Sequence, residues 1–177
     1  MWSSKSAKKV QMREIPKDEF VTPLPLARFH INLIKANNNE IWYDPFRNSG
    51  SYYKQFPSVG LWSEILDGKD FFEFNDKCDI ICSNPPYSMI DKVLEKSVII
   101  SPRVISYLLG VNNFTAKRLE YMNKHHYGLT NIHFCNVWRW FGMSVILVFE
   151  KNKKNMKGLT FDRQQWGYKR DKYIKYT

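Results

Sequence analysis

The segment Asn84-Pro85-Pro86-Tyr87 is the part of the sequence whose residue types and spacing point most directly to chemistry. Two consecutive prolines hold the backbone extended and remove two N–H donors, so the carbonyl groups of Asn84 and Pro85 are available to a ligand. An exocyclic amine bound there would meet hydrogen-bond acceptors only, and Tyr87 offers a flat face on which a planar ring can stack. An ordinary turn is the alternative interpretation.

A second polar segment runs from Asp44 to Ser51 and has the composition of a tight loop. It directly follows the short apolar run 41–43, as the first segment follows the apolar run 79–82. Two predicted strands therefore end in unusual polar loops. Asp44 could also serve only as a helix cap.

The elements that must position these loops alternate between strand and helix. Apolar runs predict strands at residues 41–43, 59–62, 79–82, 104–109, 132–137 and 145–149. Amphipathic spacing predicts helices at 23–34, through Tyr53 and Phe56, at 89–96 and at 116–124. Residues 138–144 are too short a link for a crossover helix, so the last two strands are expected to form an antiparallel pair.

This pattern predicts an α/β fold of the Rossmann-like, doubly wound type. Its sheet is expected to be mostly parallel, with helices on both faces and an antiparallel C-terminal strand pair. In such sheets ligands bind outside the carboxyl ends of the strands, near the point where the strand order reverses. Both polar loops follow predicted strands, so the sequence predicts one site between them.

Length and composition exclude several classes of protein. The 177 residues and 21.1 kDa fit one domain with tails, and 44% apolar residues exclude disorder over most of the chain. No apolar stretch approaches the roughly 20 residues that cross a bilayer, and the start lacks the apolar region of a secretory signal. We therefore expect no membrane partner and a cytoplasmic location in a prokaryotic or viral host cell, or a nuclear one in a eukaryote.

The cysteines and histidines do not indicate a metal site. Cys78, Cys82 and Cys135 show no paired CxxC spacing and are expected to be reduced. The four histidines have no metal-ligand spacing with cysteine or carboxylate residues. No metal is therefore expected.

The net charge of +10 is unevenly distributed. Residues 151–177 hold nine Lys and Arg against two Asp and Glu, together with Trp166 and three tyrosines. Such a segment suits a polyanion that offers phosphates and stackable rings, although a solubilising tail is the alternative. The chain is accordingly expected to comprise a loose basic arm at 1–17, a domain at 18–150 and a basic aromatic tail at 151–177.

The motifs together resemble those of class I S-adenosylmethionine-dependent amino methyltransferases, above all the DNA N6-adenine methyltransferases. Asn84 to Tyr87 matches the family's Asn-Pro-Pro-Tyr motif, and Phe20-Val21-Thr22-Pro23 is similar to its Phe-x-Thr-Pro segment. Asp44-Pro45-Phe46 through Gly50 looks like its Asp-Pro-Phe-x-Gly-x-Gly cofactor loop. The segments occur in the family's order, and the resemblance covers about residues 18–90.

The resemblance implies a role for each matching residue. Phe20 and Thr22 would contact the methionine end of S-adenosylmethionine, and the loop would line that end through Asp44, Phe46, Asn48 and Gly50. Glu64 would accept hydrogen bonds from the ribose hydroxyls, with Asp67 as a rival, and Asp70 with the Phe71 backbone would bind the cofactor's adenine. Phe71 could equally belong to the core. The target base would be held by the segment Asn84, Pro85, Pro86 and Tyr87.

One residue departs from the family's pattern. Asn48 stands where the family has the first glycine of the cofactor loop, and asparagine is the residue that best replaces glycine in left-handed backbone. Arg47 beside it is bulky.

The expected activity is transfer of a methyl group to adenine N6 in DNA. An RNA adenine methyltransferase and a non-catalytic methyltransferase-like subunit that binds nucleic acid are the alternatives. Only 33 residues separate Gly50 from Asn84, which leaves no room there for a target-recognition domain. A protein partner is therefore expected to assist recognition of the nucleic acid.

Overall fold

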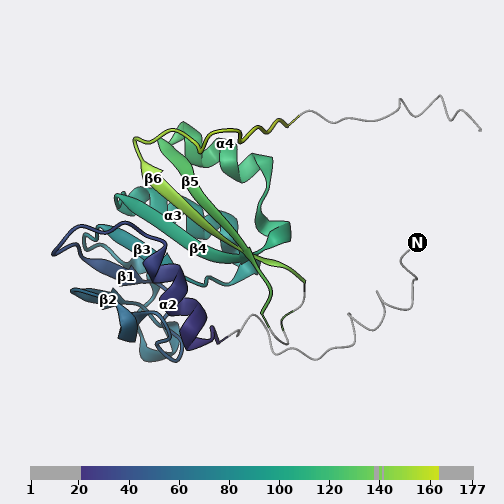
Figure 1. Ribbon diagram of the computed structural model, residues 1–177. Helices are drawn as coiled ribbons and strands as arrows, with labels where there is room; N and C mark the ends of the chain where they lie inside the picture. Colours follow the sequence, from purple (N-terminus) through teal and green to yellow (C-terminus); the bar gives the residue numbers. More distant parts are fainter. Residues whose placement is uncertain (1–20, 138–139, 141, 164–177) are drawn as a thin grey trace, which may run out of the picture.

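The computed structural model describes residues 21–137, 140 and 142–163 (Figure 1). The predicted arm at 1–17, Phe20 and the last part of the predicted tail, 164–177, lie outside the described residues. No helix in the described part of the chain is long and apolar enough to cross a membrane.

Six strands form a single sheet in the order β2-β1-β3-β4-β6-β5. The strands are β1 (Trp42–Asp44), β2 (Gly60–Trp62), β3 (Ile80–Ser83), β4 (Val104–Gly110), β5 (Tyr127–Cys135) and β6 (Ser144–Lys151). The α-helices among the described residues are α2 (Leu24–Asn32), α3 (Ile90–Ile100) and α4 (Ala116–Lys124). Short 3-10 turns occur at η1 (Tyr53–Gln55), η2 (Ile65–Asp67), η3 (Phe71–Glu73), η4 (Tyr87–Met89) and η5 (Val111–Asn113).

The strand directions confirm the predicted architecture. β1 pairs in parallel with β2 and β3, and β3 pairs in parallel with β4. β6 lies antiparallel between β4 and β5, so it alone runs against the other five strands. The strand order reverses between β1 and β3, which places the two polar loops side by side at the carboxyl edge.

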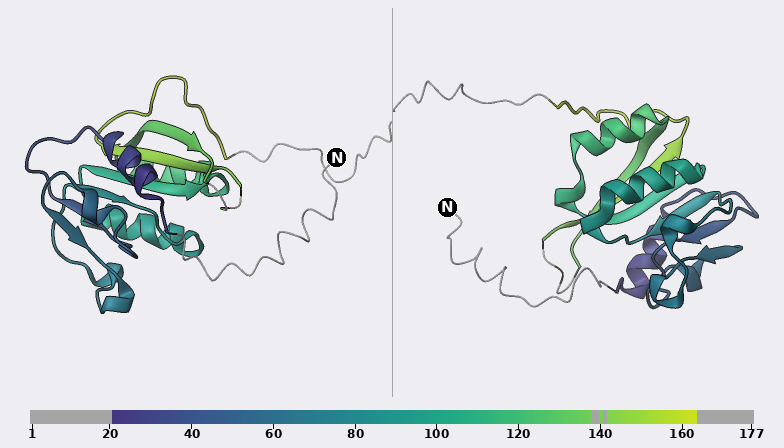
Figure 2. Two further views of the ribbon diagram at one scale, coloured as in Figure 1. Left: turned by 60° about the horizontal axis from the view of Figure 1, so that its bottom comes forward. Right: turned by 180° about the vertical axis from the view of Figure 1, so that it is seen from behind.

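Helices cover both faces of the sheet, as Figures 1 and 2 show. On one face α2 buries Ala27 and Ile31 against a cluster that includes Trp42, Ile80 and Leu108. On the other face α3 and α4 pack against the larger cluster. The spacing of the buried residues of α3 explains its orientation, because positions i, i+3, i+4 and i+7 share one side of a helix: Ile90, Val93, Leu94 and Ser97.

Two elements differ from the sequence-based expectation. The helix expected through Tyr53 and Phe56 is only the single turn η1, because Pro57 follows at once and β2 begins at Gly60. β5 begins at Tyr127 rather than at residue 132. Its first residues include glycine and asparagine, which are poor strand formers, and pairing with β6 overrides that local preference.

Residues 152–163 form a strap that returns along the outer edge of β5. Leu129 donates its N–H to Asn155 Oδ1 (2.8 Å) and accepts from the Met156 N–H (2.7 Å). Arg163 pairs with Glu120 of α4 at 2.9 Å. A Cβ atom on Gly128 would lie 2.3 Å from the Lys153 carbonyl oxygen, so the close approach of the strap requires glycine there. The first part of the predicted tail is thus packed on the domain.

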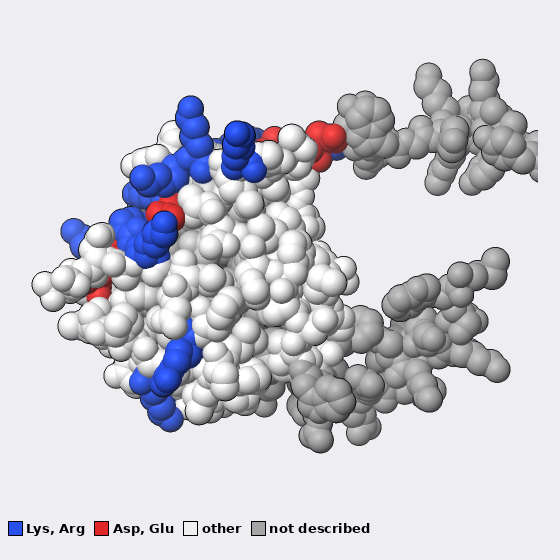
Figure 3. All heavy atoms as spheres, viewed as in Figure 1, with Lys and Arg blue, Asp and Glu red and all other residues white. Residues whose placement is uncertain are grey.

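The start of the strap is basic but lies far from the carboxyl edge. Glu150, near the end of β6, pairs with Val104, the first residue of β4. Lys and Arg side chains gather where β6 ends and the strap begins (Figure 3). This basic surface therefore lies at the amino end of the parallel strands, opposite the two polar loops.

Candidate active site

The two polar loops are joined beneath the site by a buried carboxylate. Asp44, at the end of β1, is fully buried and accepts a hydrogen bond from Ser83 Oγ, at the end of β3 (2.6 Å). It also accepts from the N–H groups of Phe46 (3.4 Å) and Tyr53 (3.3 Å). Asp44 therefore holds both ends of its own loop and connects that loop to the residue that precedes Asn84.

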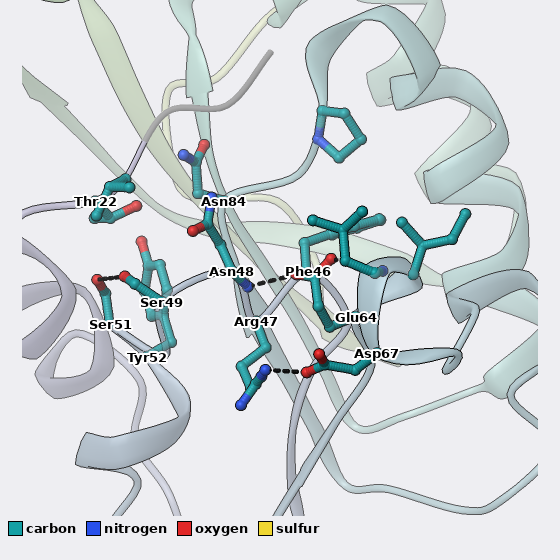
Figure 4. Close-up of a pocket in the computed structure, with 14 residues that line it drawn as sticks. Thr22, Phe46, Arg47, Asn48, Ser49, Ser51, Tyr52, Glu64, Asp67 and Asn84 are labelled. Atoms are coloured by element: carbon teal, nitrogen blue, oxygen red, sulfur yellow. Dashed lines mark hydrogen bonds and ion pairs between the residues drawn. The ribbon is translucent and has the colours of Figure 1, made fainter. Parts of the chain in front are cut away.

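A cavity of about 470 Å³ opens above this junction. Six of the residues predicted for the site line it, and they come from the loops after β1, β2 and β3 and from the segment before α2 (Figure 4): Thr22, Phe46, Asn48, Glu64, Asn84 and Pro86. In the view of Figure 4, Thr22 and Tyr52 lie on one side of the cavity and Glu64 and Asp67 on the other. The fold thus brings together residues that are more than sixty positions apart in the chain.

Other predicted residues lie around the cavity without lining it. Gly50 shapes the loop with a φ of 87° and is buried, as is Pro85. Tyr87 is partly buried and packs against Gly110 at the end of β4, where a Cβ atom would lie 3.4 Å from the ring.

Asp70 and Phe71 face away from the cavity. The Asp70 carboxylate accepts the N–H of Phe72 (2.9 Å) and lines a separate depression with Trp62 and Lys69. Phe71 is buried in the core, with its ring centroid 5.2 Å from that of Phe46. Phe71 therefore supports the cavity wall from behind.

The loop after β1 has the backbone that its sequence predicts. Asn48 takes a left-handed conformation with a φ of 45°. Its N–H donates to Glu64 Oε2 at 2.8 Å, which ties the first loop to the turn after β2. Arg47 closes the outer wall by pairing with Asp67 and by lying over the Trp62 ring, 4.1 Å from its centroid.

An apolar rim beside Glu64 was not predicted from the sequence. Ile65 and Leu66 line the cavity, yet they are 70% and 85% exposed. Exposed apolar side chains next to a carboxylate suit a ligand with a planar ring joined to a hydroxyl-bearing sugar. The only sign of this apolar rim in the sequence was the pair of apolar residues directly after Glu64.

A buried polar chain supports the wall of the cavity opposite Glu64. Tyr52, which lines the cavity together with Thr22, is hydrogen-bonded to His30 Nδ1 (2.9 Å), and His30 Nε2 lies 2.6 Å from Ser106 Oγ. Ser106 Oγ in turn lies 3.1 Å from the Leu147 carbonyl, to which it donates. Complete burial lowers the pKa of His30 to about 3, so its imidazole is neutral.

Burial raises the pKa of Asp44 from 3.8 to about 6, although its three hydrogen bonds act in the opposite direction. Between these pH values the folded state binds more protons than the unfolded state. The stability that Asp44 contributes is therefore present below about pH 4 and is lost as the pH rises to about 6.

Replacing Asp44 with asparagine should remove this pH dependence. Relative to the wild type, Asp44→Asn is expected to gain about 2–3 kcal/mol in free energy of unfolding between pH 4 and pH 7.5. Urea denaturation at both pH values measures the difference. An equal difference between the two proteins at both pH values would contradict a raised pKa.

In the described part of the chain, no group of three or more His, Cys, Asp or Glu side chains is arranged to hold a metal ion. Cys78, Cys82 and Cys135 are free thiols.

Comparison with solved structures shows that the chain has the class I methyltransferase fold. It is similar to a precorrin-6y methyltransferase from Geobacter metallireducens (TM-score 0.57, 12% identity, 79% of this chain and 95% of that one). It is also similar to a magnesium protoporphyrin IX methyltransferase from Synechocystis with bound S-adenosylmethionine (TM-score 0.55, 9% identity, 82% and 92%). At such identities the likeness concerns the fold alone.

A third similar structure is a modification subunit of a putative type I restriction enzyme from Vibrio vulnificus (TM-score 0.57, 13% identity). The match covers 85% of this chain but only 49% of that subunit, so the chain spans about half of its length. No protein-family model and no curated protein sequence matches the chain.

Proposed function

We propose that this chain is an S-adenosylmethionine-dependent methyltransferase that acts on an exocyclic amine, with adenine N6 in DNA as the favoured target. The observation that carries the proposal is the meeting of Glu64 and Asn84 at one cavity, at the carboxyl edge where the strand order reverses. A cofactor held by Glu64 would therefore lie beside an amine held by Asn84.

The cavity suits the proposed cofactor. Its volume of about 470 Å³ is in the range of sites for molecules of that size. Glu64 can accept from two sugar hydroxyls, and Ile65, Leu66 and Phe46 offer apolar contacts for the adenine ring. The charge of Asp67 is balanced by Arg47. The carboxylates of Glu64 and of Asp44 beneath the cavity favour a cationic sulfonium over an anionic ligand.

The residues of the chain then act by orientation. S-adenosylmethionine would supply an electrophilic methyl group and leave as S-adenosylhomocysteine. Acceptors at Asn84 and Pro85 draw the amine hydrogens toward them, which frees the nitrogen lone pair from the ring for in-line attack. The N–C bond would form as the S–C bond breaks, and the amine would then release one proton to solvent. Orientation of this kind supplies roughly 7–11 kcal/mol, so no strong general base is required.

Cationic side chains next to the Asn-Pro-Pro-Tyr segment favour a nucleic-acid substrate. Lys92 and Arg118 line a separate cavity of about 250 Å³ beside η4, and Lys117 stands next to Arg118 in the first turn of α4. Arg118 (2.6 Å) and Lys117 (3.2 Å) both bind Asp91 and lower its pKa. Among the described residues no salt bridge holds Lys92. Asp91 is the only carboxylate among the described residues that line this cavity, and its negative charge is already balanced by ion pairs.

Removing two of these cationic side chains should lower the affinity for nucleic acid and should also reduce the salt dependence of that affinity. For Lys92→Ala with Lys117→Ala, the slope of log K against log salt for duplex DNA is expected to fall by about 2, because each lost phosphate contact removes about 0.9. Fluorescence anisotropy at several salt concentrations measures this slope.

A matched control changes the same charge on the same two helices. Lys96→Ala with Lys124→Ala removes two lysines further along α3 and α4, away from η4. This double variant is expected to keep the wild-type slope. Equal slopes for the two double variants would show that the nucleic acid does not contact the first turns of α3 and α4.

A base inside a duplex cannot reach Tyr87 while it is stacked, so the proposed reaction on DNA requires base flipping. We further propose a protein partner that assists target recognition and a location in the cytoplasm of a prokaryotic or viral host cell. An RNA target, already single-stranded, is the second candidate substrate.

A non-catalytic subunit is the alternative from a different class. The observation that favours it is the hydrogen bond from the Asn48 N–H to Glu64 Oε2, which uses part of the carboxylate that the ribose would need. The carboxylate keeps further lone pairs, so this bond does not by itself exclude the cofactor.

Calorimetric titration with S-adenosylmethionine, followed by transfer of tritiated methyl groups to unmethylated DNA and RNA, tests the proposal. Binding with transfer to DNA is the expected result, and transfer to RNA alone would identify the second substrate. Binding without transfer to either polymer would favour the non-catalytic subunit. Absence of binding would reject the cofactor.

A further inference from the structure

Three buried polar side chains from three separate segments form one continuous hydrogen-bonded chain. Tyr52 follows the first loop, His30 lies in α2 and Ser106 lies in β4. All three are buried, and His30 and Ser106 have no exposed surface. Buried polar groups are costly unless they are paired, and here each side chain pairs with the next.

The donors and acceptors of these hydrogen-bonded side chains have one consistent order. The Ser106 hydroxyl donates to the Leu147 carbonyl, so its oxygen accepts from Nε2–H of His30. His30 Nδ1 then carries the lone pair and accepts the Tyr52 hydroxyl hydrogen. The hydroxyls of Ser106 and Tyr52 each donate once, and the imidazole is fixed in its Nε2–H tautomer.

This order matters because the outer end of the hydrogen-bonded chain reaches the cavity. Tyr52 lines the cavity, whereas His30 and Ser106 do not (Figure 4). A change at Ser106 would thus reach the cavity only through His30.

We propose that His30, held by Ser106, is a positioning residue that fixes the Tyr52 side chain in the cavity wall for binding of the cofactor. This inference rests on the proposed function, because it assigns the cavity to S-adenosylmethionine. It predicts that cofactor affinity depends on a serine in β4 that does not contact the cavity. The effect is expected on the KM for the cofactor and not on kcat at saturating cofactor.

Ser106→Ala tests the proposal, and Ser97→Ala is its matched control. Ser97 is equally buried and hydrogen-bonds Tyr107 (2.7 Å) and the Val93 carbonyl (2.6 Å), but it is not connected to the cavity. Both variants lose a buried serine hydroxyl and should lower the melting temperature by similar amounts. Only Ser106→Ala is expected to raise the calorimetric Kd for S-adenosylmethionine, by about 10-fold, because the His30 N–H loses its acceptor.

Two further measurements separate positioning from general destabilisation. His30→Gln can still accept from Tyr52 and donate to Ser106, so it should retain more cofactor affinity than His30→Leu. The ¹⁵N NMR signals of His30 should report the neutral Nε2–H tautomer in the wild type and a changed pattern in Ser106→Ala.

The possible results distinguish this inference from the proposed function. If the wild type binds the cofactor and Ser106→Ala weakens binding no more than Ser97→Ala does, the positioning role is overturned and the proposed function stands. If the wild type does not bind the cofactor, the proposed function fails, and the positioning role fails with it.

Discussion

Replacing Asn84 with alanine is expected to reduce methyl transfer by at least 10²–10³-fold, the usual loss when one oriented hydrogen bond to a transition state is removed. Asn84 directly follows β3 and lines the cavity, and Ser83 anchors the strand end beneath it through Asp44. The side chain can therefore be removed without loss of the bond that holds the two loops together. A single-turnover assay at saturating cofactor measures the effect.

Two comparisons give this result its meaning. The Kd for S-adenosylmethionine should change by less than about threefold in Asn84→Ala, since Glu64 and the apolar rim are untouched. Asn84→Asp keeps an oxygen acceptor in the same place and should retain far more activity than the alanine variant. Equal activity of wild type and Asn84→Ala would reject a catalytic role, and loss of cofactor binding would move Asn84 from the amine to the cofactor.

The second large effect is expected for Glu64→Ala, which should raise the Kd for S-adenosylmethionine by at least about 100-fold. Two hydrogen bonds from ribose hydroxyls to a carboxylate would be lost, each worth about 1.5–3 kcal/mol. Glu64 faces the cavity and is already oriented by the N–H groups of Asn48 (2.8 Å) and Leu66 (3.3 Å). Calorimetry at constant pH gives the two dissociation constants.

Asp70→Ala is a closely matched control for Glu64→Ala. Both carboxylates cap a one-turn helix, Glu64 by accepting from Leu66 and Asp70 by accepting from Phe72. Loss of such a cap costs about 1 kcal/mol of stability in either case. Only Glu64 lines the cavity, so Asp70→Ala should leave the Kd within about threefold of the wild type. If Asp70→Ala also weakens binding 100-fold, Asp70 binds the cofactor's adenine, as the sequence resemblance implies.

The sheet was predictable where the local sequence and the final packing agree. Runs such as residues 79–82 and 104–109 are apolar because both faces of the parallel sheet are covered. The first half of β5 was not predictable, since Gly128 is placed in a strand by its partners β6 and the strap. Equally, the strap pairs with β5 through Asn155 and Met156, which carry no strand pattern.

The sequence predicted which loops form the site. It did not predict as well which side chains of those loops face the cavity. Asn84 and Asp44 follow apolar runs, so their position at the carboxyl edge followed from the sheet. Asp70 and Glu64 both stand before apolar residues, and sequence alone does not separate them. The turn at Gly68, with a φ of 72°, lies between the two carboxylates, and only Glu64 faces the cavity.

The strap also bears on how copies of this protein behave when they are concentrated. A sheet that ends in an open strand can pair with the sheet of another molecule and begin aggregation. Here one outer strand, β2, has only three residues. At the other border the nine residues of β5 are partly covered, because the strap takes up both backbone groups of Leu129. Removing the residues from 152 onward would expose those backbone groups. The strap therefore protects the folded protein from edge-to-edge association with other copies of itself.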